Sequence, residues 1–308
     1  MTVGNFDGVH LGHAAIVAAL KATAGRLDMP AVALTFDPHP ASVLRPEAAP
    51  MPLTTPARRA ELLAGLGIDA VLVQPADARL MSLPAESFYT DVLRGRLRAA
   101  ALVEGADFRF GAGRRGDVTL LREWCAADGL AFDVVAPVLA GGDPVSSSRI
   151  RGLFAAGEVQ EANRLLTSPL RISGTVVQGK RRGAGLGFPT ANLASIATLV
   201  PAQGVYAARA AVADGVGDRT THAAAVHIGP NVSFGETTVS VEVHLVGFAG
   251  DLYGRRLDVD FLKRLRDTRR FDTIDELKVQ LAADVAAAVA TVDSPPSLAA
   301  ATVTARNT

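Results

Sequence analysis

Apolar residues in the first half of the chain gather in short continuous runs, and stretches with helical spacing separate these runs. The predicted strands cover residues 31–36, 70–73, 100–103 and 132–136, and the predicted helices cover residues 56–66, 85–98 and 118–128. Continuous apolar strands between helices are typical of a parallel sheet covered on both faces. The first half is therefore predicted to be an α/β domain.

The second half has a different pattern, in which glycine, proline and aspartate punctuate short strands without clear helices between them. The predicted strands cover residues 172–177, 205–212, 223–228, 239–246 and 257–261. Many short strands separated by turn residues indicate an antiparallel barrel or sandwich. One helix is predicted to follow over residues 274–292, with Thr273 or Asp272 as its N-cap.

The change of pattern falls within residues 151–170, where we expect a linking helix. The predicted parts are a first domain over residues 1–155, a linker helix over 156–170, a second domain over 171–292 and a flexible tail over 293–308. A length of 308 residues agrees with two domains of ~100–200 residues each.

Composition narrows the class of protein. Lys+Arg and Asp+Glu both number 31, so there is no net positive charge to attract nucleic acid, and no polybasic run points to a membrane surface. No apolar run reaches the ~18–20 residues of a membrane span, and Asp284 interrupts the most apolar tract. The first residues lack a signal-peptide pattern, and Cys125, the only cysteine, excludes an internal disulfide. We expect a cytoplasmic protein that is a monomer or a weak homo-oligomer.

Residues 4–13 read GNFDGVHLGH, a glycine-containing turn between a strand and the start of a helix. Backbone amides at a helix N-terminus are unpaired and suit a phosphate group. His10 and His13 are three residues apart and share a face of the first turn. Two imidazoles beside these amides can bind nucleotide phosphates, although two ordinary helix histidines would give the same short motif.

This segment resembles the H-x-G-H signature of nucleotidyltransferases, in the form found in the FMN adenylyltransferase half of bacterial FAD synthetases. Three later segments are similar to that family in the same order: residues 36–40 (FDPHP), 105–111 (GADFRFG) and 145–151 (VSSSRIR). The resemblance implies a Rossmann-like domain that transfers the AMP part of ATP to FMN and releases pyrophosphate. Independently of it, serine hydroxyls and the planar guanidinium of Arg149, on a loop before a helix, suit a triphosphate.

The same resemblance implies roles for individual residues of the first half. His10, His13 and Arg149 are expected to be catalytic. The expected nucleotide-binding residues are Gly4, Asn5, Phe6, Asp7, Gly12, Ser147 and Ser148, and the expected flavin-binding residues are Asp37, Asp107 and Phe108.

A second candidate site lies in residues 183–193, which read GAGLGFPTANL after a glycine-rich basic stretch. Thr190 and Asn192 are two apart, so in an extended segment they face the same side, and their oxygens suit Mg²⁺ together with ATP phosphates. The alternation of residues 239–245 places Glu242 on the polar side of a strand, where it can take a proton from an attacking hydroxyl. A solvated strand carboxylate is the alternative interpretation.

This segment resembles the G-F-P-T-A-N motif of riboflavin kinases, and residues 204–207, 229–234, 251–254 and 261–266 are similar to that family in order. The resemblance implies a barrel domain with Glu242 as the catalytic base. It also implies that Gly183, Thr190 and Asn192 bind nucleotide and that the last two hold Mg²⁺. The implied flavin-binding residues are Gly187, Phe188, Pro189, Tyr206 and Arg266.

Together the resemblances imply a bifunctional enzyme that phosphorylates riboflavin to FMN and adenylylates FMN to FAD, each with ATP. Three positions depart from the family pattern: only three residues precede Gly4, Ala184 stands where arginine is usual, and His227 stands where asparagine is frequent. Arg181 or Arg182 can substitute for the missing arginine. Other hypotheses are an enzyme with one active half, a flavin carrier without activity, a cytidylyltransferase, and a zinc set of His222, His227 and His244 without a supporting spacing.

Overall fold

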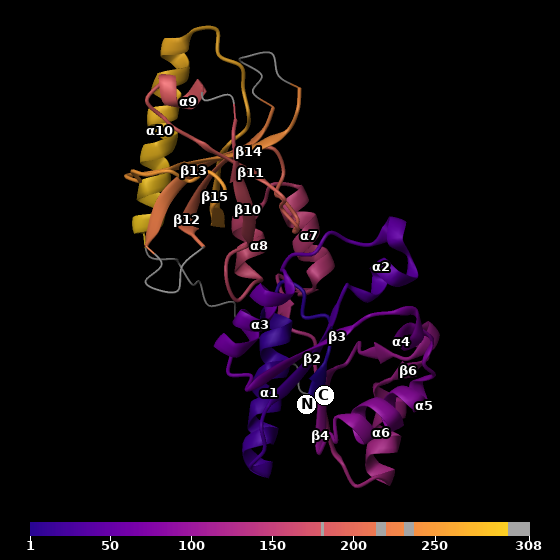
Figure 1. The fold of residues 1–308 in the computed structure, drawn as a ribbon. Coiled ribbons are helices and arrows are strands. Elements are labelled where there is room, and N and C mark those ends of the chain that lie inside the picture. The colour runs from indigo at the N-terminus through magenta and orange to yellow at the C-terminus, as the bar shows by residue number, and fades with distance from the viewer. Residues whose placement is uncertain (180–181, 214–219, 231–236, 295–308) are drawn as a thin grey trace. The chain divides into compact units, whose positions relative to one another are not determined.

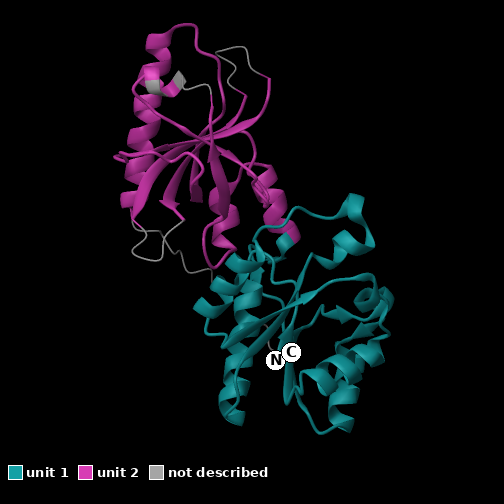
Figure 2. Ribbon diagram, viewed as in Figure 1, with its two compact units in different colours: residues 1–147, 300–308 teal, residues 148–299 magenta. Residues whose placement is uncertain are grey.

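The structure is a computed structural model that describes residues 1–179, 182–213, 220–230 and 237–294, with only the backbone of residues 182 and 184. The described chain divides into two compact units, one formed by residues 1–147 and one that begins at Ser148 (Figures 1 and 2).

The first unit begins with alternating strands and helices. Its elements are β1 (Thr2–Val3), α1 (Leu11–Leu27), β2 (Val32–Asp37), α2 (Pro40–Leu44), the 3₁₀ turn η1 (Pro46–Ala48), α3 (Pro56–Gly65), β3 (Ala70–Pro75), α4 (Ala78–Ser82), α5 (Ala85–Ser87), the π-helical η2 (Phe88–Arg96), β4 (Ala101–Gly105), β5 (Arg109–Phe110), the 3₁₀ turn η3 (Ala112–Arg114), β6 (Gly116–Asp117), α6 (Val118–Ala127), β7 (Ala131–Val135), β8 (Leu139–Ala140) and β9 (Asp143–Pro144).

The parallel strands of the first unit form a central sheet whose order reverses at β1. β1 pairs with β2 and β2 with β3, while β4 pairs with β7. The Val103 amide donates to the Met1 carbonyl at 3.0 Å, which joins β4 to the free side of β1. The order β3-β2-β1-β4-β7 confirms the predicted parallel-sheet domain. In such sheets ligands bind at the carboxyl ends of the strands where the order reverses, which here is the end of β1.

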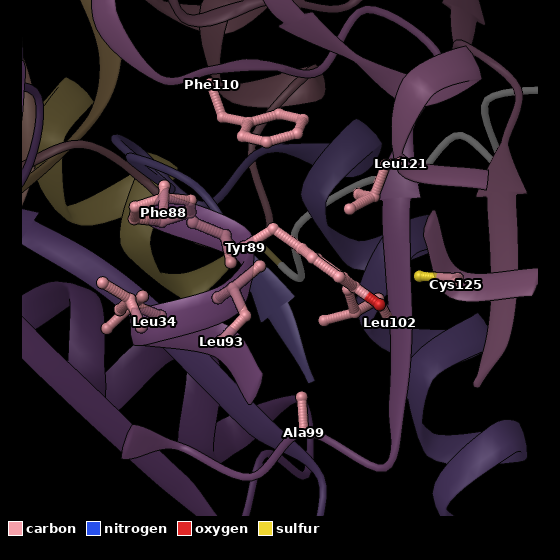
Figure 3. Close-up of a cluster of buried hydrophobic side chains, with 11 residues drawn as sticks. Leu34, Phe88, Tyr89, Leu93, Ala99, Leu102, Phe110, Leu121 and Cys125 are labelled. Carbon is pink, nitrogen blue, oxygen red and sulfur yellow. The ribbon is translucent and has the colours of Figure 1, made fainter. Parts of the chain in front are cut away.

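Two buried clusters cover the two faces of this sheet. Consecutive strand residues alternate between them: Leu102 packs in the cluster with η2 and α6, and Val103 packs in the cluster with α1. Figure 3 shows the first cluster, which contains Leu102 together with Phe88, Phe110 and Leu121. The sheet is therefore held rigidly from both sides, and its strand ends are fixed positions for a site.

The predicted helix over residues 85–98 is only partly correct. It divides into α5 and the wider π-helical turns of η2, where the Leu97 amide donates to the Val92 carbonyl at 3.0 Å, five residues back. Phe88 and Leu93 are both buried in this segment. By contrast, α3 matches the predicted helix closely, because Pro56 occupies its first turn and the Thr55 hydroxyl caps it.

The second unit is a closed antiparallel barrel with one long helix, so the structure decides for the barrel over the sandwich. Its strand order is β10-β11-β14-β13-β12-β15. Its elements are α7 (Ser147–Ala155), which begins at the border of the units, α8 (Val159–Arg164), β10 (Arg171–Val177), α9 (Arg182–Gly185), β11 (Ala191–Ala194), β12 (Gly204–Val212), β13 (Thr221–Gly229), β14 (Ser240–Leu245), β15 (Arg256–Arg266) and α10 (Ile274–Asp293).

The barrel strands alternate between an interior face and a face covered by α10. Val226, Val243 and Phe261 are completely buried in the interior. Helix α10, yellow-orange in Figure 1, packs on β12 and β13 and is capped by the Thr273 hydroxyl, one of the two predicted caps. Residues on the covered face therefore line a space between the barrel and α10.

The predicted single linking helix is wrong. Helix α7 ends at Ala155 and α8 begins at Val159, with Gly157 between them at a φ of +81°. This φ favours glycine, and a Cβ at Gly157 would lie 2.8 Å from the Arg264 guanidinium, which would have to shift. Helix α7 also begins at Ser147, so the serine triplet that was expected on a loop enters the helix.

Candidate active sites

The turn after β1 delivers two histidines to the start of α1. His10 is the N-cap of this helix, and its Nδ1 accepts from the His13 amide at 3.4 Å, while the His13 Nδ1 accepts from the His10 amide at 3.2 Å. Their rings stack with centroids 3.6 Å apart. Because each Nδ1 accepts a backbone hydrogen, each neutral ring carries its proton on Nε2. The two histidines thus form the first turn of the helix and keep their Nε2–H groups as donors.

Burial keeps both imidazoles uncharged. Desolvation lowers the pKa of His10 to about 4, against smaller opposite effects of Asp107 and Asp7. Desolvation also lowers the pKa of His13, and the neighbouring His10 and Arg59 act in the same direction. Near neutral pH the site therefore presents neutral N–H donors at the positive end of a helix, a combination that suits phosphate oxygens.

The Asp7 side chain is buried, and its hydrogen bonds are to other parts of the protein. Its side chain is 1% exposed and accepts from the amides of Leu53 and Thr54 and from the Thr54 hydroxyl, each at 3.0 Å. The Arg59 guanidinium lies 3.8 Å away. The Asp7 carbonyl accepts from the Ser147 hydroxyl at 2.8 Å. Asp7 therefore ties three distant segments to the turn, and its carboxylate is occupied by protein donors.

The carboxyl ends of β1 and β2 meet beside this turn. The Asn5 amide nitrogen lies 3.0 Å from Nε2 of His39, whose Nδ1 accepts from the Ala41 amide. Asp37 ends β2 and precedes a cis peptide bond to Pro38. The expected residues Asn5 and Asp37 are thus brought to the same edge of the sheet.

Backbone hydrogen bonding places Gly4, and the limited space beside the His10 ring constrains the Gly12 position. The Gly4 amide donates to Leu34 at 3.0 Å and extends the β1–β2 ladder. A Cβ at Gly12 would lie 3.0 Å from the His10 ring. Phe6 is 2% exposed, with a φ of +47°, and its ring meets the His13 ring edge-on at 5.1 Å.

Asp107 and Phe108 follow β4, and they have different environments. Asp107 is exposed and its charge acts on His10, so it faces the same strand end. Phe108 stacks on Phe110 at 5.4 Å and packs against the core cluster of Figure 3. Ser148 and Arg149 follow in the first turn of α7, past the unit border, and their contact with a nucleotide stays a prediction.

The second unit contains a cavity of about 130 Å³ between the covered face of the barrel and α10. Its walls are mostly apolar, with Phe271 and the α10 residues Leu277 and Leu281 opposite Val205 of β12. Glu242 and Thr190 lie at one side of this cavity. An apolar pocket with a few polar groups on one side is typical of small-molecule sites.

Strand register forms a row of side chains across the cavity floor. In the ladders Asn192 is opposite Glu242, Glu242 is opposite His227, His227 is opposite Val205, and Val205 is opposite Arg266. Opposite residues of antiparallel strands have Cβ atoms ~4.5–5.5 Å apart and share a face. Five strands thus contribute one residue each to a continuous row.

Hydroxyl groups hold the Glu242 carboxylate in place. Thr190 Oγ1 donates to one oxygen at 3.3 Å, and Ser240 Oγ donates to the other at 3.2 Å. Asn192 of β11 is its direct neighbour in the ladder. The carboxylate is therefore oriented beside the oxygen-bearing side chains of Thr190 and Asn192.

The opposite end of the row is held by charge. The Arg266 guanidinium donates to both oxygens of the buried Asp284 carboxylate of α10, at 2.7 Å from Nη2 and at 3.0 and 3.2 Å from Nε. This carboxylate also accepts from Gln280 at 2.9 Å. Arg269 lies over the Phe271 ring at 4.7 Å and donates to Gln280 at 2.6 Å. This network fastens α10 over the cavity.

The loop before β11 forms the remaining wall. The Phe188 amide donates to the Gly183 carbonyl at 2.8 Å, and both residues line the cavity. The Pro189 carbonyl lies 2.8 Å from Nδ1 of His244, whose ring meets Phe188 edge-on at 5.8 Å. Gly187 allows this turn with a φ of +88°.

Comparison with known families identifies both halves. A family model described as FAD synthetase matches residues 1–149, and one described as riboflavin kinase matches residues 166–292. The bifunctional riboflavin kinase/FMN adenylyltransferase of Escherichia coli (strain K12) is 37% identical over 92% of this chain and 90% of its own length. The chain belongs to this bifunctional family.

Two further likenesses extend over both halves. The bifunctional riboflavin kinase/FMN adenylyltransferase of Pseudomonas fluorescens is 40% identical over 93% of this chain and 91% of its own. The crystal structure of a protein named macrolide-efflux protein from Streptococcus pneumoniae is similar with a TM-score of 0.83 and 31% identity, covering 96% of this chain and 94% of that chain. Within the described residues, no helix combines the length and apolar character needed to cross a bilayer.

In the riboflavin kinase domain, one expected flavin-binding residue lies elsewhere. Tyr206 is completely buried in the barrel interior, where its ring meets Phe261 edge-on and its hydroxyl donates to the Ala202 carbonyl. Alternation places Val205, its neighbour in β12, on the cavity side instead. The structure thus gives Tyr206 a packing position behind the cavity.

Some expected residues of the kinase domain lie outside the described part of the chain, and the hypothetical zinc set lies within it. Part of residues 229–234 and Arg181 lie outside the described residues, as do the side chains of Arg182 and Ala184. In the part of the chain that the structure describes, no group of three His, Cys, Asp or Glu residues can hold a metal ion. His222 is near the Val246 carbonyl and Phe248, and so does not form a zinc set with His227 and His244.

Sequence reasoning missed supporting residues in both domains. In the FAD synthetase domain, the buried Glu104 carboxyl accepts from the Val3 amide at 2.8 Å and thereby completes the short strand β1. In the kinase domain, Asp284 holds Arg266. The only sequence signal for Asp284 was a single carboxylate inside an alanine-rich helix, and Glu104 had a similar signal at the end of an apolar strand.

Proposed function

We propose that this chain converts riboflavin to FMN in its kinase domain and FMN to FAD in its FAD synthetase domain, with one ATP consumed in each step. The observation that carries this proposal is the oriented Glu242 carboxylate at the edge of an apolar cavity, beside Thr190 and Asn192. A carboxylate in that position can accept a proton from a hydroxyl group, and the apolar cavity suits a flat aromatic ring system.

In the kinase reaction, the terminal hydroxyl of the ribityl chain attacks the γ-phosphate of ATP. Glu242 accepts the hydroxyl proton while the new O–P bond forms, and ADP leaves as the bond to the β-phosphate oxygen breaks. The hydroxyls of Thr190 and Ser240 keep the carboxylate turned toward the cavity. Most of the catalysis then comes from positioning and charge stabilisation, as is usual for phosphoryl transfer.

The donor set beside Glu242 fits Mg²⁺. Thr190 and Asn192 offer neutral oxygens, the hard ligands that this ion prefers when nucleotide phosphates supply the others. When bound, Mg²⁺ would neutralise phosphate charge. Thr190 and Asn192 would hold it, and would orient the nucleotide relative to Glu242.

In the adenylyltransferase reaction, the FMN phosphate attacks the α-phosphate of ATP and pyrophosphate leaves. The Nε2–H groups of His10 and His13 donate to phosphate oxygens, and the amides at the start of α1 add to the positive field. Because both rings are neutral, they stabilise growing negative charge by hydrogen bonding. Ser147, Ser148 and Arg149 are proposed to bind the leaving phosphates.

The test is a chromatographic time course with ATP and Mg²⁺, started in parallel from riboflavin and from FMN. We expect riboflavin to pass through FMN to FAD, and the FMN-started reaction to yield FAD. Accumulation of FMN with no FAD from either start would show that only the kinase is active, and no change in either flavin would leave a binding role. ATP compared with CTP tests the nucleotide.

A further inference from the structure

His227 is a polar side chain that lines the cavity floor and takes no part in the proposed phosphorylation of riboflavin. It lies in β13 directly opposite Glu242 of β14, on the face covered by α10. On its other side it is opposite Val205, which is apolar. His227 is therefore the polar position next to the carboxylate in the direction of the apolar cavity.

The ring of His227 faces the cavity. Among the residues that the structure describes, no hydrogen bond to either of its ring nitrogens is found, and neither nitrogen is a buried unsatisfied atom. Its neighbour on the same face, His244, uses Nδ1 to contact the Pro189 carbonyl, and Glu242 contacts the hydroxyls of Thr190 and Ser240. Both ring nitrogens are therefore open to the cavity, where a bound ligand can pair with them in place of solvent.

Burial keeps the His227 ring neutral by lowering its pKa. Desolvation lowers its pKa, and Arg266 of β15 acts in the same direction, against the carboxylates of Glu242 and Asp284. Arg269 and His244 are the other ionisable groups lining the same cavity. A neutral imidazole has one N–H donor and one acceptor nitrogen, which match a hydroxyl group that also donates and accepts.

We propose that His227 binds a hydroxyl of the ribityl chain next to the one that Glu242 deprotonates, and so makes the kinase domain select flavins with a polyol side chain. The proposal rests on the proposed role of Glu242 in this cavity. The cross-strand spacing of ~4.5–5.5 Å between the two Cβ atoms is short enough for one carbon chain to contact both residues. The apolar wall that Val205 forms with Phe271 and the α10 residues Leu277 and Leu281 is then left for the flavin ring.

The experiment compares two substrates in the full-length protein. One is riboflavin, and the other is a flavin whose ribityl group is replaced by a plain hydroxypentyl chain, which keeps the terminal hydroxyl and lacks the others. ADP release gives kcat/KM of the kinase for each, and quenching of flavin fluorescence gives the dissociation constant. For His227→Leu we expect a loss of about 5–20-fold with riboflavin and less than about 2-fold with the analogue, as for one lost hydrogen bond.

Matched controls separate this role from folding and from an effect on Glu242. His227→Asn retains a donor and an acceptor, so it should keep more riboflavin activity than His227→Leu. FAD formation from FMN in the same preparations checks the other domain. Equal losses with both substrates would mean that His227 acts through Glu242 or the fold, and an unchanged value with riboflavin would mean no contact; either result overturns the proposal.

Discussion

The two candidate sites use their polar groups in opposite ways. At the start of α1, His10 and His13 bond each other's backbone amides, and Asp7 is occupied by amides of residues 53 and 54. These side chains build the site and stabilise the fold at once. On the barrel, Glu242 and His227 lie on the strand face that lines the cavity. There the main-chain hydrogen bonds between strands hold the backbone in place, whatever the side chains are.

This difference predicts which substitutions separate activity from stability. In the first unit a functional histidine is also a helix cap, so its removal affects both properties. In the second unit the barrel hydrogen bonds come from the main chain, so a side chain on its outer face can change with little effect on folding. Substitutions at the two sites therefore test the comparison directly.

The largest effect is expected for Glu242→Gln. The amide retains the shape but accepts no proton, so riboflavin phosphorylation should fall about 10²–10⁴-fold. Formation of FAD from FMN should stay unchanged, because it takes place in the other domain. Initial rates from both starting flavins give the answer, and a loss below about 3-fold would remove Glu242 from the role of base.

His10→Asn is expected to have the next largest effect. Asparagine is a good N-cap and can still accept from the His13 amide, but it has no group equivalent to the Nε2–H donor. FAD formation from FMN should fall about 10²–10³-fold while the thermal unfolding midpoint of the first unit changes little. His10→Ala is the matched variant, and should lose both activity and about 1 kcal/mol of stability.

How far the sequence predicted these sites depends on whether the signal is local. The start of α1 was predictable because the glycine-containing turn and the two histidines lie within ten residues, and Pro56 marked the first turn of α3. Asp7 was expected to contact nucleotide, because nothing in its neighbourhood indicates partners that are 46 residues away. Such long-range pairing is set by tertiary packing.

The barrel shows the same limit for register. Motifs identified Thr190, Asn192 and Glu242, but the row that joins them to His227 and Arg266 requires the registers of four ladders and the irregularity between Val205 and Tyr206. A shift by one residue would turn each side chain to the other face. Strand β11 itself was missed, since its Ala-Asn-Leu-Ala sequence has no strong strand pattern.

Acid should remove stability that His10 gives to the first unit. The folded state holds His10 with a pKa of about 4, below the ordinary value of 6.5. Between these values the unfolded chain binds a proton that the folded chain does not, so stability falls as the pH falls from 6.5 to about 4. The shift corresponds to about 3 kcal/mol, and His13 acts in the same direction.

This pH effect can be measured through one fluorophore. Trp124 is the only tryptophan of the chain and packs near Tyr89 and Phe110 in the first unit, so its fluorescence follows that unit alone. Urea midpoints from pH 7 to pH 4 should decrease in the wild type and decrease less in His10→Asn. Equal slopes for the two proteins would contradict the assignment to His10.

The smallest predicted effect concerns Glu104, which supports the short strand β1. Burial raises the pKa of its carboxyl well above the ordinary value, so the folded state retains a proton that the unfolded state releases as the pH rises. Glu104→Gln keeps an acceptor for the Val3 amide and needs no proton, so at pH 7 it should be more stable than the wild type. Glu104→Ala leaves this amide without its partner and should instead lose about 1–3 kcal/mol. The same Trp124 urea curves measure both variants, and a Gln variant less stable than the wild type at pH 7 would mean that the charged carboxylate is what holds β1 in place.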